Sequence, residues 1–342
     1  GVFLTQPLYD RATGVRRDQA EITADQAEVD FATAEENLIL RVAQRYFDIL
    51  AARDEVQFAR ANKEAIARQL EQVTRRFEVG LVTITDVQEA QARFDQSVTT
   101  EIQALNNLAD RKEALREITG RYYDSDLATL QDNIPLEQPQ PADPDHWAQL
   151  ALGNNLSLQS AAYAADIARE AIDLERSGHY PTLDLTASYS ENDSGNLDQR
   201  SGSIGLQLDI PLYLGGAVSS RTREAAFRHE AAKQRREEVQ RAVVRQVQNA
   251  YRGIETAISL VKALAQARIS SRSSLEATEA GFEVGTRTIV DVLNAQSELL
   301  RAERDYSQAR YGYILNRLSL DQAVGGLDEA DLENIQSQLR GN

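Results

Sequence analysis

The sequence has 342 residues and a formal net charge of −16, because 53 acidic side chains outnumber 37 basic ones. An acidic surface of this size repels phosphate backbones, and no segment carries the basic cluster that nucleic-acid recognition needs, which excludes DNA and RNA as partners. The absence of cysteine excludes disulfide scaffolds, thiolate metal sites and thiol nucleophiles. Only 7 prolines and 18 glycines interrupt the chain, so we expect long uninterrupted elements.

The start of the chain is unusual. There is no methionine, and Gly1 opens an apolar-looking run, so we expect that an N-terminal segment has been removed. No run of 18 apolar residues occurs, which excludes a membrane-spanning helix from this sequence. A membrane role would have to use β-strands.

An internal repeat organises the chain. Phe77-Glu78-Val79-Gly80 returns as Phe282-Glu283-Val284-Gly285 at an offset of 205 residues, and the same offset relates residues 83–87 to residues 288–292. Near the start, residues 7–9 match residues 211–213 at an offset of 204. The second copy begins near Asp143, roughly sixty residues before its Pro-Leu-Tyr element, whereas the first copy has only a few residues before the same element. We therefore expect that a leading helix and most of one strand hairpin are missing from the first copy.

Each copy contains a long proline-free stretch with helical spacing of apolar residues, from about Val15 to Val79 and from about Ser219 to Val284. At 1.5 Å per residue, each helix would be roughly 95–100 Å long. The helix that returns after each of them has the spacing of a coiled-coil seam. In the second copy the seam positions are Val292, Ala295, Leu299, Ala302, Tyr306, Ala309, Tyr313, Asn316, Leu320 and Ala323. In the first copy they are Val87, Ala90, Phe94, Ser97, Glu101, Ala104 and Leu108.

Between the helical stretches lies a segment in which apolar and polar residues alternate, as in a strand hairpin with one apolar face. The apolar positions are Leu183, Leu185, Ala187 and Tyr189 before a polar tip at residues 191–201, and Ile204, Leu206, Leu208 and Ile210 after it. Val2 and Leu4 occupy the matching positions of the first copy. Strands of about ten residues cross a bilayer when tilted. The alternative is half of a soluble sheet packed on helices.

Two such hairpins per intact chain give four strands, which are too few to close into a barrel with an interior. Open edges are not tolerated in hydrocarbon, so several chains must share one barrel. The expected fold class is therefore mainly α with membrane β, in which long coiled-coil helical hairpins form an α-barrel tunnel continuous with a shared transmembrane β-barrel.

The predicted domains follow the repeat. Residues 1–10 are the remnant of a first-repeat barrel strand, 11–120 the first long helical hairpin, and 121–180 an inter-repeat equatorial segment with short helices. Residues 181–213 are the second-repeat β-hairpin, 214–325 the second long helical hairpin, and 326–342 a C-terminal equatorial tail.

The motifs at residues 76–87 and 284–293, with Ala309-Arg310-Tyr311 after the second, resemble those of the TolC family of outer-membrane efflux proteins, and the resemblance covers essentially the whole chain. It implies a homotrimer in outer-membrane lipid of a Gram-negative cell, with a periplasmic extension. It also implies a periplasmic adaptor protein and an inner-membrane RND, MFS or ABC transporter as partners, in multidrug efflux and type I secretion. The chain would then be a passive exit duct.

The two glycine turns, Val79-Gly80-Leu81 and Val284-Gly285-Thr286, interrupt long helices. As structure alone they are helix C-caps, where glycine adopts a conformation that a side chain would block. The resemblance implies that they also form the exposed rim of the tunnel and dock the helical tips of the adaptor.

Asp86 and Asp291 fall in the first turn of each returning helix, where favourable interaction with the helix dipole is a sufficient reason for a carboxylate. Under threefold symmetry, three copies at one constriction would repel one another, which raises their proton affinity, and would attract cations. The resemblance implies that Asp291 forms an acidic ring at the periplasmic entrance. At the second ring position the best-known member of the family has another acidic residue and this chain has Asn294, so we expect weaker cation binding there.

Arg287 is a suitable partner for these carboxylates, because a guanidinium can bridge helices by paired hydrogen bonds; the alternative is an ordinary solvated arginine. The resemblance implies that Arg287 bonds to Thr85 and Asp86 of a neighbouring hairpin and locks the entrance. A companion tyrosine of the family is replaced by Phe282, which has no hydroxyl. We therefore expect one lock contact to be absent and the resting channel to open more readily.

Other candidate sites are weak. His146, His179 and His229 share no ligand spacing, and Trp147 indicates the start of a short helix with a packing role. We find no catalytic, cofactor or metal motif, and an enzyme on a helical scaffold has no site to support it. The remaining alternative is a soluble periplasmic adaptor or coiled-coil spacer, which should carry lipoyl-like and small β-barrel segments and lack strands of bilayer length.

Overall fold

The computed structural model describes residues 1–123, 127–131, 133–193 and 198–340. The chain divides into two compact units. The first comprises Gly1–Ala34 and Leu152–Val244, and the second comprises Glu35–Ala151 and Arg245–Asn342. Among the described helices, none combines the length and the apolar character needed to cross a membrane.

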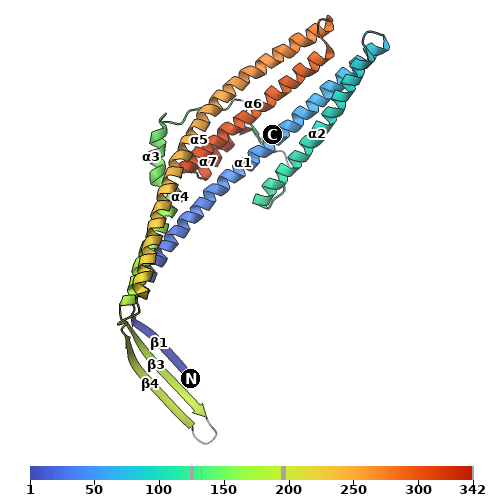
Figure 1. Ribbon diagram of the computed structural model, residues 1–342. Helices are drawn as coiled ribbons and strands as arrows, with labels where there is room; N and C mark the ends of the chain where they lie inside the picture. The colour runs from blue at the N-terminus through green and yellow to red at the C-terminus, as the bar shows by residue number, and fades with distance from the viewer. Residues whose placement is uncertain (124–126, 132, 194–197, 341–342) are drawn as a thin grey trace. The chain divides into compact units, whose positions relative to one another are not determined.

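A three-stranded antiparallel sheet lies in the first unit (Figure 1). Its order is β1 (Val2–Tyr9), β3 (Thr182–Asp193) and β4 (Asp198–Asp209). The predicted hairpin is confirmed, but β3 and β4 have 12 residues each, so the predicted polar tip at 191–201 was too long. The polar residues there remain in the strands because serine hydroxyls pair across them, as between Ser190 and Ser201 at 2.8 Å. Residues 194–197 of the predicted tip lie outside the described residues.

The strand register separates the sheet into an apolar and a polar face. Leu206 lies opposite Leu185, and Leu4 and Ile204 both lie opposite Ala187, so apolar side chains line one face across all three strands. On the other face the hydroxyls of Ser188 and Ser203 lie 2.8 Å apart. Ile204 is 82 % and Leu206 67 % exposed, so nothing in the described part of the chain covers these side chains of the apolar face.

Two short helices complete the first unit, α4 (Leu156–Arg176) and the 3-10 helix η1 (Ser177–His179). They pack against the beginnings of two long helices, α1 (Arg11–Glu78) and α5 (Ala217–Glu283). Polar contacts fix this packing, since Ser160 donates to the carboxylate of Asp30 at 2.6 Å and Arg221 pairs with Glu175 at 3.2 Å.

Two helical hairpins dominate the chain. Helix α1 returns as α2 (Ile84–Thr119), and α5 returns as α6 (Ile289–Val324). The ends of α1 and α5 and both ends of the returning helices are offset by 205 residues, which confirms the internal repeat. On α6, seven of the predicted seam positions are buried: Val292, Leu299, Ala302, Ala309, Tyr313, Leu320 and Ala323. On α2 the charged seam residue Glu101 is ion-paired with Arg60 and Lys63 of α1.

Smaller elements flank the hairpins in the second unit. They are β2 (Thr129–Leu130), α3 (Pro144–Asn154), α7 (Glu329–Ser337) and β5 (Leu339–Arg340), and β2 pairs with β5. Residues 127 and 128, just before β2, are tied to α1, since Arg53 and Tyr46 donate to the carbonyls of these residues at 2.9 and 2.8 Å. Trp147 lies in the first turns of α3, as predicted.

Candidate functional site

Both hairpins close through the same backbone turn. Gly80 has φ +76° and donates to the carbonyl of Phe77 at 2.9 Å, and Gly285 has φ +79° and donates to that of Phe282 at 3.1 Å. The next residue reaches back one position further, with Leu81 donating to Arg76 at 2.9 Å. This left-handed glycine with two nested hydrogen bonds satisfies the last carbonyls of the helix, so the predicted C-caps are confirmed.

A capping box starts each returning helix. The backbone N–H and the hydroxyl of Thr288 each donate to Oδ2 of Asp291 at 2.9 Å, and the Asp291 N–H donates back to the hydroxyl at 3.3 Å. Thr83 and Asp86 repeat the arrangement on α2. The backbone and side-chain hydrogen bonds from Thr288, with a smaller contribution from nearby Arg287, lower the pKa of Asp291. Its carboxylate is therefore ionised at neutral pH within the single chain.

An apolar cluster behind the turns joins the two hairpin ends. Its buried members come from α1, α5 and α6 and are Ile66, Val73, Leu275, Phe282, Ile289, Val292, Leu293 and Leu299. Val82, Val87 and Phe94, in and after the first turn, pack against it. The tips of the two hairpins of one chain are therefore packed on each other.

The predicted lock residues lie at these tips. Arg287 and Thr85 are exposed, and Asp86 and Asp291 are half-buried by their caps. Within the described residues, Arg287 makes no hydrogen bond or ion pair to Thr85 or Asp86 of the same chain. Asn294 is exposed one turn after Asp291. The tips also expose apolar side chains, with Val284 75 % exposed and Val79 and Leu81 nearly as open.

Phe282 has a partner that its sequence position did not indicate. The guanidinium carbon of Arg76, near the end of α1, lies 4.4 Å from the centroid of the Phe282 ring, and Phe282 is only 9 % exposed. A cation at this distance over a ring face is attracted by the ring quadrupole. The equivalent Phe77 is 39 % exposed. Arg76 directly precedes the repeated motif, but the sequence did not indicate this contact, because it joins residues about two hundred positions apart.

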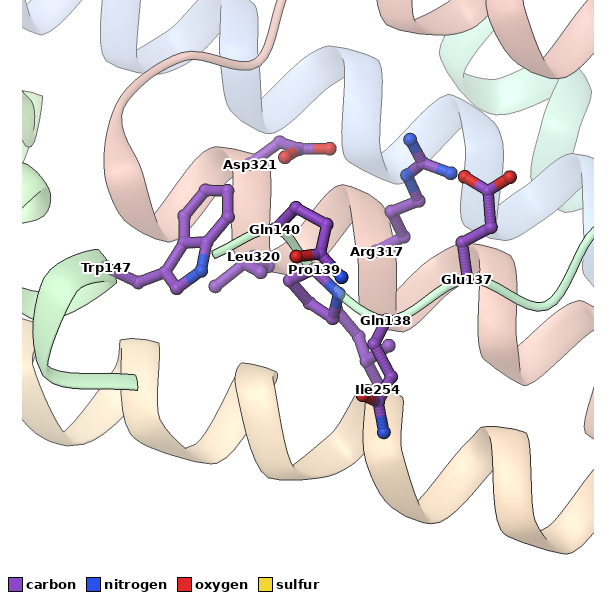
Figure 2. Close-up of a pocket in the computed structure, with 9 residues that line it drawn as sticks. All are labelled: Glu137, Gln138, Pro139, Gln140, Trp147, Ile254, Arg317, Leu320 and Asp321. Carbon is purple, nitrogen blue, oxygen red and sulfur yellow. The ribbon is translucent and has the colours of Figure 1, made fainter. Parts of the chain in front are cut away.

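A cavity lies away from the tips, beside α3, α5 and α6 (Figure 2). It has a volume of about 250 Å³, and its walls include Trp147, Arg317 and Asp321. Trp147 donates its indole N–H to the carbonyl of Pro141 at 2.9 Å, which supports the predicted packing role. Burial, reinforced by the neighbouring Asp331, raises the pKa of Asp321 to about 6. Across the described ranges, no three His, Asp or Glu side chains come together as a metal site would require.

Comparison with known proteins finds relatives that match most of the chain. The family model described as outer membrane efflux protein matches residues 1–121 and 147–326. The chain is 44 % identical to the outer membrane protein TolC of Vibrio cholerae serotype O1, over 99 % of this chain and 79 % of that protein. It is 32 % identical to the alkaline protease secretion protein AprF of Pseudomonas aeruginosa, over 98 % of this chain and 71 % of AprF.

A solved structure has the same fold. The crystal structure of the CmeC outer membrane channel of Campylobacter jejuni superimposes with a TM-score of 0.80, covering 98 % of this chain and 73 % of CmeC at 15 % identity. The family model matches more than half of the chain, on both repeats and both hairpin tips. The chain belongs to the outer membrane efflux protein family, the TolC family.

Proposed function

We infer that the chain is an outer-membrane exit channel for efflux and type I secretion, and that it is a conduit and not an enzyme. TolC is an outer membrane protein and AprF a protease secretion protein, and both align with nearly the whole of this chain. The location is the outer membrane of a Gram-negative cell, and the soluble adaptor alternative is not favoured. The energy for transport comes from an inner-membrane transporter, and an adaptor protein links that transporter to the channel.

We propose that three copies assemble into the channel and that the hairpin tips form its periplasmic gate. The observation that carries this proposal is the pair of matched turns, each with a left-handed glycine and a Thr–Asp capping box, packed on one apolar cluster. Arg287 has no carboxylate partner among the described residues of its own chain, although Asp291 is ionised nearby. The lock contact to Thr85 and Asp86 is then a contact to a neighbouring subunit.

The other tip residues take roles that fit their exposure. Three Asp291 carboxylates, each fixed by Thr288, line the entrance as an anionic ring, with uncharged Asn294 behind them. The exposed turns at Val79-Gly80-Leu81 and Val284-Gly285-Thr286 offer apolar side chains to the helical tips of the adaptor.

Conductance of the full-length protein in a planar bilayer tests the proposal, together with the number of subunits joined by cross-linking. We expect a trimer whose single-channel conductance rises with Arg287→Ser, because the inter-subunit lock is lost. Unchanged conductance in Arg287→Ser would remove this residue from the gate. A full-length protein that is monomeric and does not conduct would contradict the channel itself.

A further inference from the structure

The two hairpin tips differ in an informative way. Under the offset of 205 residues, Arg76 corresponds to Gly281, and Val82 corresponds to Arg287. The backbone of the two turns is the same in both copies, as the glycine φ values and the capping boxes show. The tips therefore carry different side chains on equivalent backbones, and each has an arginine at a place where the other has none.

Gly281 provides the surface on which Arg287 rests. Its carbonyl accepts three hydrogen bonds, from the Thr286 N–H at 2.8 Å, the Thr286 hydroxyl at 3.0 Å and the Arg287 N–H at 3.2 Å. A Cβ at position 281 would lie 2.7 Å from Cγ of Arg287, far inside van der Waals contact. The aliphatic stem of Arg287 therefore lies directly against the bare backbone of α5, and any larger residue would displace it.

Arg76 fixes the same stretch of α5 from the other hairpin. Phe282 follows Gly281 directly, and its ring is held between the apolar cluster and the guanidinium of Arg76, 4.4 Å from the ring centroid. In the first copy, the residue equivalent to Arg287 is Val82, which packs against that cluster. Only the second tip thus presents an arginine beyond the turn, and the first tip supplies the cation that holds its base.

We propose that Arg76 and Gly281 are positioning residues for the gate arginine. Arg76 holds the last turn of α5 through the Phe282 ring, and Gly281 lets the stem of Arg287 lie against that turn so that its guanidinium is aimed at the neighbouring subunit. This inference rests on the proposed gate. It also gives Phe282 a function as the acceptor of a cation–π contact.

The test is a set of full-length variants measured in planar bilayers, each in the wild-type background and combined with Arg287→Ser. We expect Arg76→Gln and Gly281→Ala each to raise single-channel conductance by at least half as much as Arg287→Ser does. Neither should add to the conductance of Arg287→Ser, because both act through that side chain. Alanine is the stronger helix former, so Gly281→Ala does not threaten the folding of α5.

Controls separate positioning from a general effect on charge or packing. Arg75→Gln removes the same charge one residue earlier, from a side chain that pairs with Glu71 of its own helix, and should leave conductance unchanged. Arg76→Lys keeps a cation over the ring and should retain most of the closed state. Phe282→Leu keeps an apolar side chain without a ring and should match Arg76→Gln, with no further rise when the two are combined.

The outcomes distinguish this inference from the gate on which it rests. If Arg287→Ser opens the channel but Arg76→Gln and Gly281→Ala leave conductance at the wild-type value, Arg76 and Gly281 have no positioning role and the gate stands. Full additivity with Arg287→Ser overturns the inference as well, because the residues would then act elsewhere. No effect of Arg287→Ser contradicts the gate itself.

Discussion

Asp291 and Asn294 lie one turn apart on α6 and differ in what they bring to the tip. Asp291 is tied to Thr288 by two hydrogen bonds at 2.9 Å, so its charge has a fixed position and its pKa is lowered. Asn294 is exposed and uncharged. A multivalent cation binds a ring of carboxylates more tightly as the number of negative charges near it increases. In the proposed trimer, the tips would thus form one acidic ring with a neutral position behind it.

We predict that Asn294→Asp increases the affinity with which multivalent cations block the channel. The added carboxylate places a second anionic ring one helical turn from the first, and opposite charges at short range attract strongly in a constriction with little water. Block of single-channel current by a trivalent cation, titrated on the periplasmic side, measures the affinity.

Gln308→Asp, an exposed change farther along α6, provides the matched control and should leave the block unchanged. Equal block in Asn294→Asp and the wild type would place residue 294 outside the entrance.

At the junction of α6 with α7, a carboxylate is buried near other acidic side chains, which disfavours its ionised form. Asp321 lines the cavity in Figure 2, and burial raises its pKa to about 6, with Asp331 of α7 and the N-cap residue Asp328 adding repulsion and Arg317 opposing it. Glu137 lines the same cavity and contributes a further acidic side chain. When folding raises the pKa of an acid, the ionised form of that acid destabilises the folded state.

We predict that Asp321→Asn stabilises the protein at neutral pH. The unfolded group ionises near pH 4 and the folded group near pH 6, so the wild type loses stability as pH rises between these values, by at most about 3 kcal/mol per subunit. Asparagine has no charge to bury, so the variant should have a flatter profile over that range and a higher melting temperature at pH 8.

Thermal unfolding of the full-length protein between pH 4 and 8 measures this difference. Asp110→Asn, an exposed change on α2, serves as the control. Parallel pH profiles for Asp321→Asn and the wild type would contradict the assignment.

The helical elements could be predicted well because their information is local. The seam of α6 follows from the spacing of its apolar residues, and the positions predicted from Val292 to Ala323 are largely those that are buried. Glu101 is the informative case on α2. Its place in the seam depends on Arg60 and Lys63, which lie about forty residues earlier in the chain and meet it only after the hairpin has folded.

At the scale of the whole molecule, the described sheet is open at both edges. In the described part of the chain, β1 and β4 each have one strand neighbour, and the apolar face they share is exposed. Unpaired strand edges and an uncovered apolar face are stable in a bilayer only when further strands close the sheet. In the proposed trimer, further strands, including those of sister subunits, would close the sheet.

We predict that Leu206→Arg reduces assembly in the outer membrane, because its side chain is on the apolar face and an arginine facing lipid costs up to about 4 kcal/mol, depending on depth. Gln207→Arg puts the same charge on the next residue of β4, on the polar face, and should be tolerated. The yield of heat-resistant trimer from membrane extracts compares the two. Equal yields would mean that the apolar face does not contact lipid.

The sequence predicted the architecture more fully than the gate. The repeat, the hairpins, the turns and the strand alternation can each be recognised from short sequence patterns. The Thr–Asp caps lie where the two acidic residues indicated. The contact of Arg76 with Phe282 could not be read from the sequence, since it requires the ends of α1 and α5 to pack together. The proposed lock contacts of Arg287 would be set by subunit packing, which no single-chain pattern contains.

The two turns limit the kind of motion by which the proposed periplasmic entrance can widen. Each tip keeps its own shape through a left-handed glycine and a Thr–Asp cap, so it does not have to unravel when the helices behind it shift. Ala302 and Ala309 on α6 are buried and have short side chains. Short side chains interlock little with a neighbouring helix, so they do not hinder the helices from sliding past each other. We therefore expect the proposed gate to open by a tilt of the helices with their turns intact, and to close again without refolding either turn.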